Sequence, residues 1–306
     1  MATFEAEAYR LLDSSLSDNS KRAYTQAISS FEKFRHEFHL PHVWPVPTQH
    51  LFRYIGFMSL QGRAASTVSQ HIAAISRSHK LQLCVDSTDN FIVRKMLQGM
   101  RINSHVSDGR LPITITILSR LVQALPAVCY STFETKLFSG IFTLAFFAFL
   151  RVSEIVKTNT SPRKGLKLHD LSLGASSLEL RVRFSKTDQT GCGHNLCITN
   201  NSNPQICPVS AVSDYLKLRP VSDSTDYLFI HLNGKAVTRS QFTSVLTNAL
   251  KFAGLYQAGY NTHSFRIGAA TTAAMMGIPS ELIKEWGRWK SDAFKRYIRI
   301  SLNEGR

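Results

Sequence analysis

The chain has 306 residues, of which 43% are hydrophobic, so it is long enough for two domains and too apolar for global disorder. Its net charge is +15, and the charge is uneven: residues 109–306 hold 24 Lys and Arg against 12 Asp and Glu, net +12, whereas residues 1–108 hold 12 against 9, net +3. This asymmetry favours a polyanionic partner such as nucleic acid, and no amphipathic tail or lipidation motif indicates a membrane. A charge that only keeps the protein soluble is the alternative.

The five cysteines are an odd number, and no secretory signal precedes them, so we expect reduced thiols in an intracellular protein. Cys192, His194 and Cys197 suggest a metal site, but their spacing is not that of a zinc knuckle and they fall in a strand pattern. The longest nearly apolar run, residues 141–150, is far shorter than the roughly 20 residues that span a bilayer. We therefore expect no metal, no cofactor and no membrane.

Apolar residues recur at helical spacing through the first hundred positions, and prolines and capping residues separate the segments. The expected helices follow the caps Ser17 to Ser20, then span about 51–58 and 66–80 with Ser66 as a cap, and a fourth begins near Asp89. Short amphipathic helices joined by short links predict a small helical bundle. The residues before the caps read as a polar approach without a predicted helix.

The third of these helices and its entry carry a polar and basic set. The set consists of Arg63, Thr67, Gln70, Arg77 and Lys80. Such a face suits DNA phosphates and base edges. An ordinary solvated helix face explains the same residues at least as well.

A polar stretch with Gly109 and Pro112 separates this bundle from the rest of the chain. We assign residues 1–104 to the bundle, residues 105–112 to a linker and residues 113–306 to a second domain.

The second domain should be mostly helical with a small antiparallel sheet, which makes the fold class mainly α (α+β). Helices are expected over 114–125, stopped by Pro126, and over 132–150, whose apolar residues on nearly every side predict burial. The alternation in 178–184 and the run 194–199 predict two strands, and 168–173 supplies a third. Two more helices should span Pro208 to Leu218 and Thr238 to Ala253.

Arg151 comes directly after the buried helix. A guanidinium there must find an anion, because an unpaired buried charge is costly. Glu154, three residues later, gives a purely internal pair. The alternative is a ligand phosphate, with Glu154 fixing the arginine.

The stretch 261–300 divides into three short helices. Thr262 is expected to cap the first, Gly277 and Pro279 to separate the first from the second, Gly287 to end the second, and Ser291 to cap the third.

His263 and Arg266 share the opening turn of the first helix, where free N–H groups favour an anion. Arg matches phosphate oxygens, and His can move a proton near neutral pH. Tyr297 follows in basic surroundings, which a tyrosine needs in order to act as a nucleophile. Taken singly, a capping histidine, a core tyrosine and a solvated basic face are the more ordinary interpretations. The occurrence of His263, Arg266, Trp289 and Tyr297 in this order is what indicates a catalytic site.

Several sequence stretches together resemble the tyrosine recombinase (phage integrase) family. They are QGRAASTVSQHIAAISRSHK at 61–80, FLRVSEI at 149–155, FSKT at 184–187, HSFR at 263–266, GRW at 287–289 and RYIR at 296–299. The wording GRWKSDAFKRYIR is most similar to recombinases of the eukaryotic DIRS-like and Crypton mobile elements. The resemblance covers nearly the whole chain.

The resemblance implies a 3′-phosphotyrosine intermediate formed by Tyr297 at a DNA phosphodiester. It implies that Arg151 and Arg266 stabilise the phosphate charge, that His263 removes the tyrosine proton, and that Lys186 protonates the leaving oxygen. Trp289 would supply an indole N–H to the phosphate. The family's core-binding domain clamps DNA, which favours DNA contact by the basic helix of the bundle, with the duplex between the two domains.

We therefore expect a metal-independent, ATP-independent enzyme of DNA recombination or integration that binds double-stranded DNA and self-associates on it as a dimer or tetramer. The resemblance to eukaryotic elements indicates the nucleus. A DNA-binding protein of recombinase fold without activity and a type IB-like topoisomerase are the alternatives.

Overall fold

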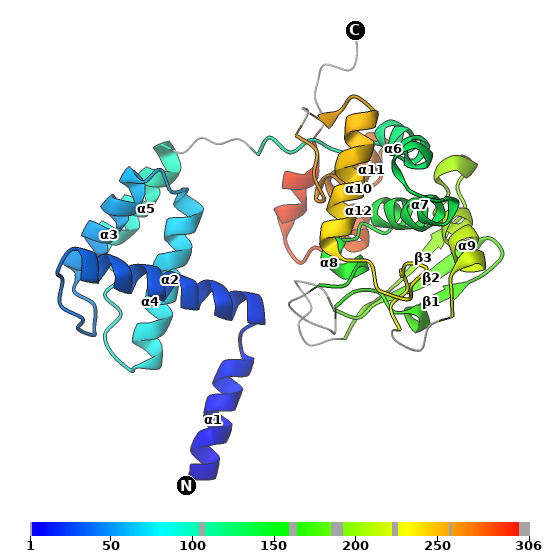
Figure 1. The fold of residues 1–306 in the computed structure, drawn as a ribbon. Helices are drawn as coiled ribbons and strands as arrows, with labels where there is room; N and C mark the ends of the chain where they lie inside the picture. The colour runs from blue at the N-terminus through cyan, green and yellow to red at the C-terminus, as the bar shows by residue number, and fades with distance from the viewer. Residues whose placement is uncertain are drawn as a thin grey trace. The chain divides into compact units, whose positions relative to one another are not determined.

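The structure is a computed structural model, and it describes residues 2–103, 108–158, 164–184, 192–221, 226–256 and 259–299. The chain divides into two compact units, Met1–Asp108 and Gly109–Arg306. In Figure 1 the first unit runs from blue to cyan, and the second runs from green to red. Each unit has its own hydrophobic core.

The first unit is helical. Its helices are α1 (Ala2–Ser14), α2 (Asp18–Glu37), α3 (Thr48–Leu60), α4 (Ala65–Leu81) and α5 (Phe91–Asn103). The last four pack together around buried side chains that include Phe31, Tyr54, Val68 and Ile75. The predicted helical bundle is therefore confirmed.

Two details of the first unit differ from the sequence prediction. Residues 2–14 form a helix, with an ion pair between Arg10 and Glu7 one turn apart, where only a polar approach was expected. Ser66 is not a cap, because α4 begins at Ala65 and Ala64 holds the extended N-cap position. The expected cap of α2 is confirmed, since the Ser17 hydroxyl accepts a hydrogen bond from the backbone N–H of Ser20.

The second unit contains helices and one small sheet. Its elements are α6 (Ile115–Val128), α7 (Thr132–Phe147), α8 (Val152–Ile155), η1 (Leu168–Asp170), β1 (Leu171–Leu173), β2 (Ser177–Val182), β3 (His194–Thr199), η2 (Pro204–Ile206), α9 (Pro208–Leu218), α10 (Arg239–Phe252), α11 (Ser264–Met275), α12 (Ser280–Trp286) and η4 (Asp292–Tyr297). Helix α7 is buried along most of its length and packs against α6, α9 and α11. The burial predicted for this helix is confirmed.

The three strands form an antiparallel sheet in the order β1-β2-β3. Leu180 of β2 pairs with Leu171 of β1 and Leu196 of β3. Alternate residues of β2 point into the core, as the two-residue period predicted. Residues 168–170, expected in a strand, form a 3-10 turn instead. The mostly helical fold with a small antiparallel sheet is confirmed.

Pro126 does not stop its helix, which was the prediction. Helix α6 continues to Val128, and the N–H of Cys129 still donates to Leu125 O at 2.9 Å. Proline has no backbone N–H, so α6 lacks one i to i−4 hydrogen bond at Pro126. Since the helix ends two residues later, only its last turn is affected.

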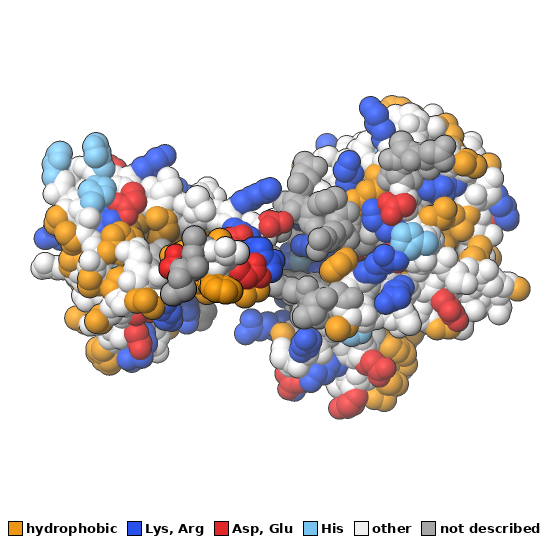
Figure 2. All heavy atoms as spheres, turned by 90° about the horizontal axis from the view of Figure 1, so that it is seen from below, with side chains coloured by type: hydrophobic (Ala, Val, Ile, Leu, Met, Phe, Trp, Pro, Cys, Tyr) orange, Lys and Arg blue, Asp and Glu red, His pale blue; other side chains and the backbone are white. Residues whose placement is uncertain are grey.

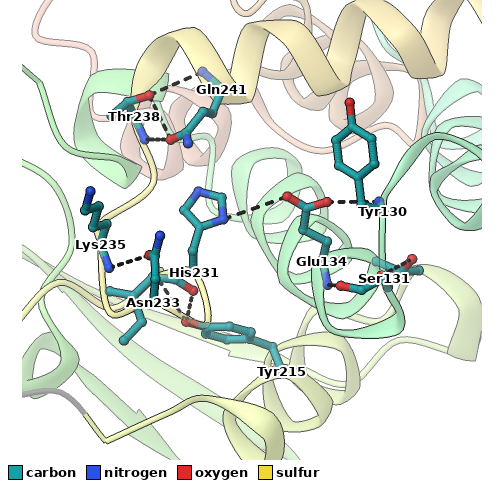
Figure 3. A network of polar contacts seen from close by, with 11 residues as sticks. Tyr130, Ser131, Glu134, Tyr215, His231, Asn233, Lys235, Thr238 and Gln241 are labelled. Carbon is teal, nitrogen blue, oxygen red and sulfur yellow. Dashed lines mark hydrogen bonds and ion pairs between the residues drawn. The ribbon is translucent and has the colours of Figure 1, made fainter.

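A polar network fixes the start of α10 (Figure 3). Thr238 and Gln241 form a reciprocal capping box, with the Thr238 N–H donating to Gln241 Oε1 at 2.9 Å. The turn before it is held by His231, whose Nδ1 lies 3.8 Å from Glu134 Oε1 at the start of α7. The network therefore sets the position of Arg239, the first residue of α10.

No helix in the described part of the chain is long and apolar enough to cross a bilayer. On the face of the second unit drawn in Figure 2, Lys and Arg side chains are spread among acidic ones and do not form one patch.

Candidate active site

The turn after α7 presents Arg151. Phe149 adopts a left-handed backbone (φ 51°) that ends the buried helix, and Arg151 is the N-cap of α8. The Arg151 N–H donates to Glu154 Oε2 at 2.9 Å, and Arg151 Nη1 donates to Glu154 Oε1 at 2.8 Å. One carboxylate therefore fixes both the backbone and the guanidinium of Arg151, which is the internal pair that the sequence suggested.

The same carboxylate binds a second arginine. Arg288 Nη2 donates to Glu154 Oε2 at 3.0 Å, and both side chains are almost completely buried. Burial alone would raise the pKa of Glu154, but the charges of Arg288, Arg151 and Arg266 hold that pKa below its usual value. Glu154 is therefore a carboxylate at neutral pH.

Arg266 lies on α11 and is 1% exposed. Its Nη1 donates to Phe149 O at 2.5 Å, and its Nη2 donates to Gly287 O. Burial and then the charge of Arg151 lower the pKa of Arg266 to about 9, so the guanidinium is still charged at pH 7. The charge of Glu154 opposes this lowering of the Arg266 pKa.

The turn of residues 287–289 brings an indole onto Arg266. The Arg266 Cζ lies 4.2 Å from the centre of the Trp289 ring, in cation–π contact. A Cβ on Gly287 would come within 1.5 Å of Cζ3 of that ring, so only glycine fits here. The turn itself places Arg288 in a left-handed conformation (φ 56°). The indole Nε1 is buried and has no hydrogen-bond partner among the described residues.

Tyr297 completes this group from η4. Its ring centre lies 5.1 Å from that of Trp289 and 5.9 Å from Arg266 Cζ, and its side chain is half-buried. The Thr271 hydroxyl donates to Tyr297 O at 3.1 Å, which ties η4 to α11. Ser291 caps this segment as predicted, but the segment is a 3-10 helix.

His263 occupies the N-cap position of α11, where Thr262 was expected. The Asn261 side chain, which accepts from the His263 N–H at 2.9 Å, forms the turn that shifts the helix start by one residue. Burial, then the positive charges of Arg110, Arg151, Arg239 and Arg266, lower the pKa of His263. The imidazole is therefore neutral at pH 7 and able to accept a proton.

Five of the six predicted catalytic residues lie in the described structure. Trp289 and Tyr297 contact Arg266, while the charge of Arg151 acts on Arg266 and the charge of Arg266 acts on His263. Lys186 lies outside the described residues.

The predicted DNA-contact residues lie on α4 and its entry, and none of them belongs to the buried residues of this helix, which include Val68, Ile72 and Ile75. Arg63, Gln70 and Lys80 are exposed. Arg77 Nη2 donates to Leu12 O at 3.4 Å, and Lys80 Nζ lies 3.5 Å from Asp86 Oδ2.

Arg288 was missed as a site residue. The Gly-Arg-Trp motif contains Arg288, but the family resemblance gives a role only to Trp289 of this motif. Arg110 and Arg239, whose charges act on His263, were missed as well, because neither belongs to a motif. Among the described residues no group of three or more His, Cys, Asp or Glu side chains could hold a metal ion.

Residues 7–81 match the family described as the phage integrase N-terminal SAM-like domain. An integrase/recombinase XerD homolog of Selenomonas ruminantium is 25% identical over 306 residues, and the match covers 95% of this chain and 84% of that protein.

Solved structures with a similar fold include two DNA complexes. The XerH site-specific recombinase bound to its difH substrate superposes with a TM-score of 0.65 at 15% identity, covering 92% of this chain and 76% of that one. A lambda integrase dimer bound to a COC′ core site gives 0.63 at 13% identity, covering 99% and 80%. These relatives do not bear on the finer similarity to DIRS-like and Crypton elements, which stays a prediction.

Proposed function

We propose that this chain, a relative of the tyrosine recombinases in sequence and in fold, cleaves and rejoins DNA strands through Tyr297. The substrate is double-stranded DNA, and the intermediate is a 3′-phosphotyrosine. The observation that carries the proposal is the meeting of Arg266, Trp289 and Tyr297, on three different elements, beside Arg151.

The arginines act on the phosphate. Arg151 keeps part of its side chain at the surface, 15% exposed, while Glu154 holds its orientation. Arg266 adds a fixed positive charge next to the Tyr297 ring. Charge that develops on the non-bridging oxygens in the transition state is stabilised by such preorganised cations. A Trp289 N–H directed to a phosphate oxygen would satisfy the donor that has no partner among the described residues.

The covalent step is a transesterification. The Tyr297 oxygen bonds to phosphorus while the bond from phosphorus to the 5′-oxygen breaks. The tyrosine proton goes to His263, which is neutral because its pKa is lowered. The 5′-oxygen takes a proton from Lys186. Attack by a 5′-hydroxyl reverses the step, and since the energy of the phosphodiester is retained in the intermediate, neither ATP nor a metal is required.

The proposal extends to the whole chain. Residues 1–104 clamp DNA, with Arg63, Thr67, Gln70, Arg77 and Lys80 as contacts, and residues 113–306 form the catalytic domain after a linker at 105–112. The lambda integrase structure of similar fold is a dimer on DNA, which supports self-association of this chain on its substrate. A nuclear location is part of the proposal only through the resemblance to eukaryotic elements.

Covalent trapping tests the function. The protein is incubated, without metal or ATP, with duplexes that carry a nick near candidate sites, and a protein–DNA adduct is sought after denaturation. Tyr297→Phe should form no adduct while its DNA affinity stays within about threefold of wild type, since only the nucleophilic oxygen is removed. Tyr130→Phe is the matched control, because Tyr130 is 98% exposed in the same unit.

An adduct in Tyr297→Phe equal to that of wild type would end the tyrosine assignment. Binding without any adduct in wild type, across a library of duplex sites, would favour a DNA-holding protein. Relaxation of plasmids without recombinant products would favour the topoisomerase.

A further inference from the structure

Arg288 is an unusual residue for an interior position. Its side chain is 1% exposed, and its backbone has a positive φ of 56°, a conformation that L residues other than Asn and Asp rarely adopt. A buried charge and a left-handed backbone both cost free energy, so they persist only where the surroundings hold them. Such a residue calls for an explanation in terms of what it contacts.

Two of its contacts are with acceptors that the candidate phosphate-binding arginines also use. One nitrogen, Arg288 Nη2, lies 3.0 Å from Glu154 Oε2 and 3.0 Å from Phe149 O. Glu154 is the carboxylate that fixes Arg151, and Phe149 O accepts from Arg266. Arg288 therefore connects the carboxylate that holds Arg151 with the carbonyl that holds Arg266.

We infer that Arg288 is a positioning residue: by binding Glu154 and Phe149 O together, it fixes Arg151 and Arg266 relative to each other in the geometry that a phosphate requires. This inference rests on the proposed function. The near-complete burial of the Arg288 side chain separates its role from direct contact with DNA. Two arginines that grip one phosphate must keep their spacing, because a displacement of about 1 Å can cost about 100-fold in rate.

Electrostatics supports the same role. The charge of Arg288 is the largest of the influences that hold the pKa of Glu154 below its usual value against burial. A Glu154 that took up a proton would become a poorer acceptor for the Arg151 guanidinium. Arg288 thus keeps the support of Arg151 ionised as well as in place.

The kinetic test uses adduct formation on a nicked duplex at saturating protein, alongside DNA affinity. Arg288→Met should lower the adduct rate by about 100-fold and change affinity by less than about threefold. Arg288→Lys keeps the charge but loses the planar fork, so it should recover part of the rate. Combining Arg288→Met with Glu154→Gln should cost little more than either change alone, because both act on one support.

A matched control separates positioning from general structure. Arg219, the C-cap residue of α9, also satisfies interior acceptors: it donates to Leu228 O at 3.0 Å and to Tyr227 O at 2.9 Å, and neither carbonyl is an acceptor of Arg151, Arg266 or Arg288. Arg219→Met should leave the adduct rate unchanged. Equal rate losses in Arg219→Met and Arg288→Met would overturn the inference in favour of a structural role.

A measurement without DNA keeps the inference independent of activity. Arginine side-chain Nε–H signals in NMR report the order of Arg151 in the free protein. The Arg151 signal should broaden or shift in Arg288→Met and stay close to wild type in Arg288→Lys and Arg219→Met. An unchanged Arg151 signal in Arg288→Met would refute positioning even if adducts form. If the wild type forms no adduct, but the Arg151 signal still changes in Arg288→Met, the result would count against the proposed function and not against positioning by Arg288.

Discussion

The arginines of the candidate site, Arg151, Arg266 and Arg288, and the basic side chains of α4 and its entry are all positively charged, but they differ in burial and in how they are held. Arg266 and Arg288 are buried, and each has a hydrogen-bond partner more than 100 positions away in the sequence. Arg63, just before α4, and Lys80 on α4 are exposed, and the ion pair of Lys80 is with Asp86, only six positions later. Chemistry demands fixed geometry, whereas phosphate contact that only holds DNA tolerates mobile side chains. The two regions should therefore respond differently to the same substitution.

Removing one arginine from each region gives the largest contrast. Arg151→Ala should lower the rate of adduct formation by about 10²- to 10³-fold, since it removes the donor that we propose for the phosphate. DNA affinity should change little. Both quantities are measured on one nicked duplex, with single-turnover kinetics for the rate.

Arg63→Ala is the counterpart on the first unit. Its adduct rate at saturating protein should equal that of wild type. The slope of log affinity against log salt should become shallower by about 0.9, the value for one neutralised phosphate. If Arg151→Ala and Arg63→Ala had the same effects on rate and slope, the distinction between the two regions would be lost.

Replacing one glycine by alanine in each unit compares the packing of the two units, and we expect effects of intermediate size. Gly287→Ala places a Cβ 1.5 Å from the Trp289 ring, so the ring must move off Arg266, and the free energy of unfolding should fall by about 1–3 kcal/mol. Gly56→Ala in α3 meets no atom within 4 Å and should stabilise by about 0.5–1 kcal/mol, since alanine favours a helix interior. Urea unfolding of both variants measures the difference, and equal stabilities would contradict the packing at the 287–289 turn.

The smallest expected effect concerns pH and the first unit. Burial is the first cause that lowers the pKa values of His50, His71 and His79. Below the ordinary value of about 6.5 the unfolded chain binds more protons than the folded one, so the free energy of unfolding should fall as pH drops from 6.5 towards the lowered values.

His79 identifies the mechanism, because its Nε2 accepts the Val46 N–H at 2.8 Å and would lose this bond on protonation. His79→Gln should show a weaker dependence of stability on pH between 5 and 6.5, measured by urea unfolding. A dependence as steep as that of wild type would exclude His79 as the titrating group.

Local patterns predicted much of the fold because their causes are local. The proline at the start of α9 and the alternation in β2 are readable within a few residues, and both elements form where expected. The predicted start of α4 was wrong, since several small polar residues near this position could each serve as the cap. A helix over 2–14 was missed because its apolar side chains lie mostly at the surface.

The candidate site was predicted unevenly for the same reason. Glu154 could be named as the partner of Arg151 because three residues separate them. Its second partner, Arg288, is 134 residues away and reaches it only when the 287–289 turn lies against the end of α7. No sequence period encodes that packing.

The way in which Arg266 is held has a consequence for the sign of the local field. Both of its Nη groups donate to backbone carbonyls, Phe149 O and Gly287 O, which are neutral dipoles. A carboxylate partner would have fixed the side chain equally well and cancelled its charge. Carbonyls, one of them just past the C-terminal end of α7, orient the guanidinium without adding a negative charge of their own. The charge of Glu154 acts on Arg151, Arg266 and Arg288 together, so one carboxylate faces three guanidinium groups and the interior keeps an excess of positive charge.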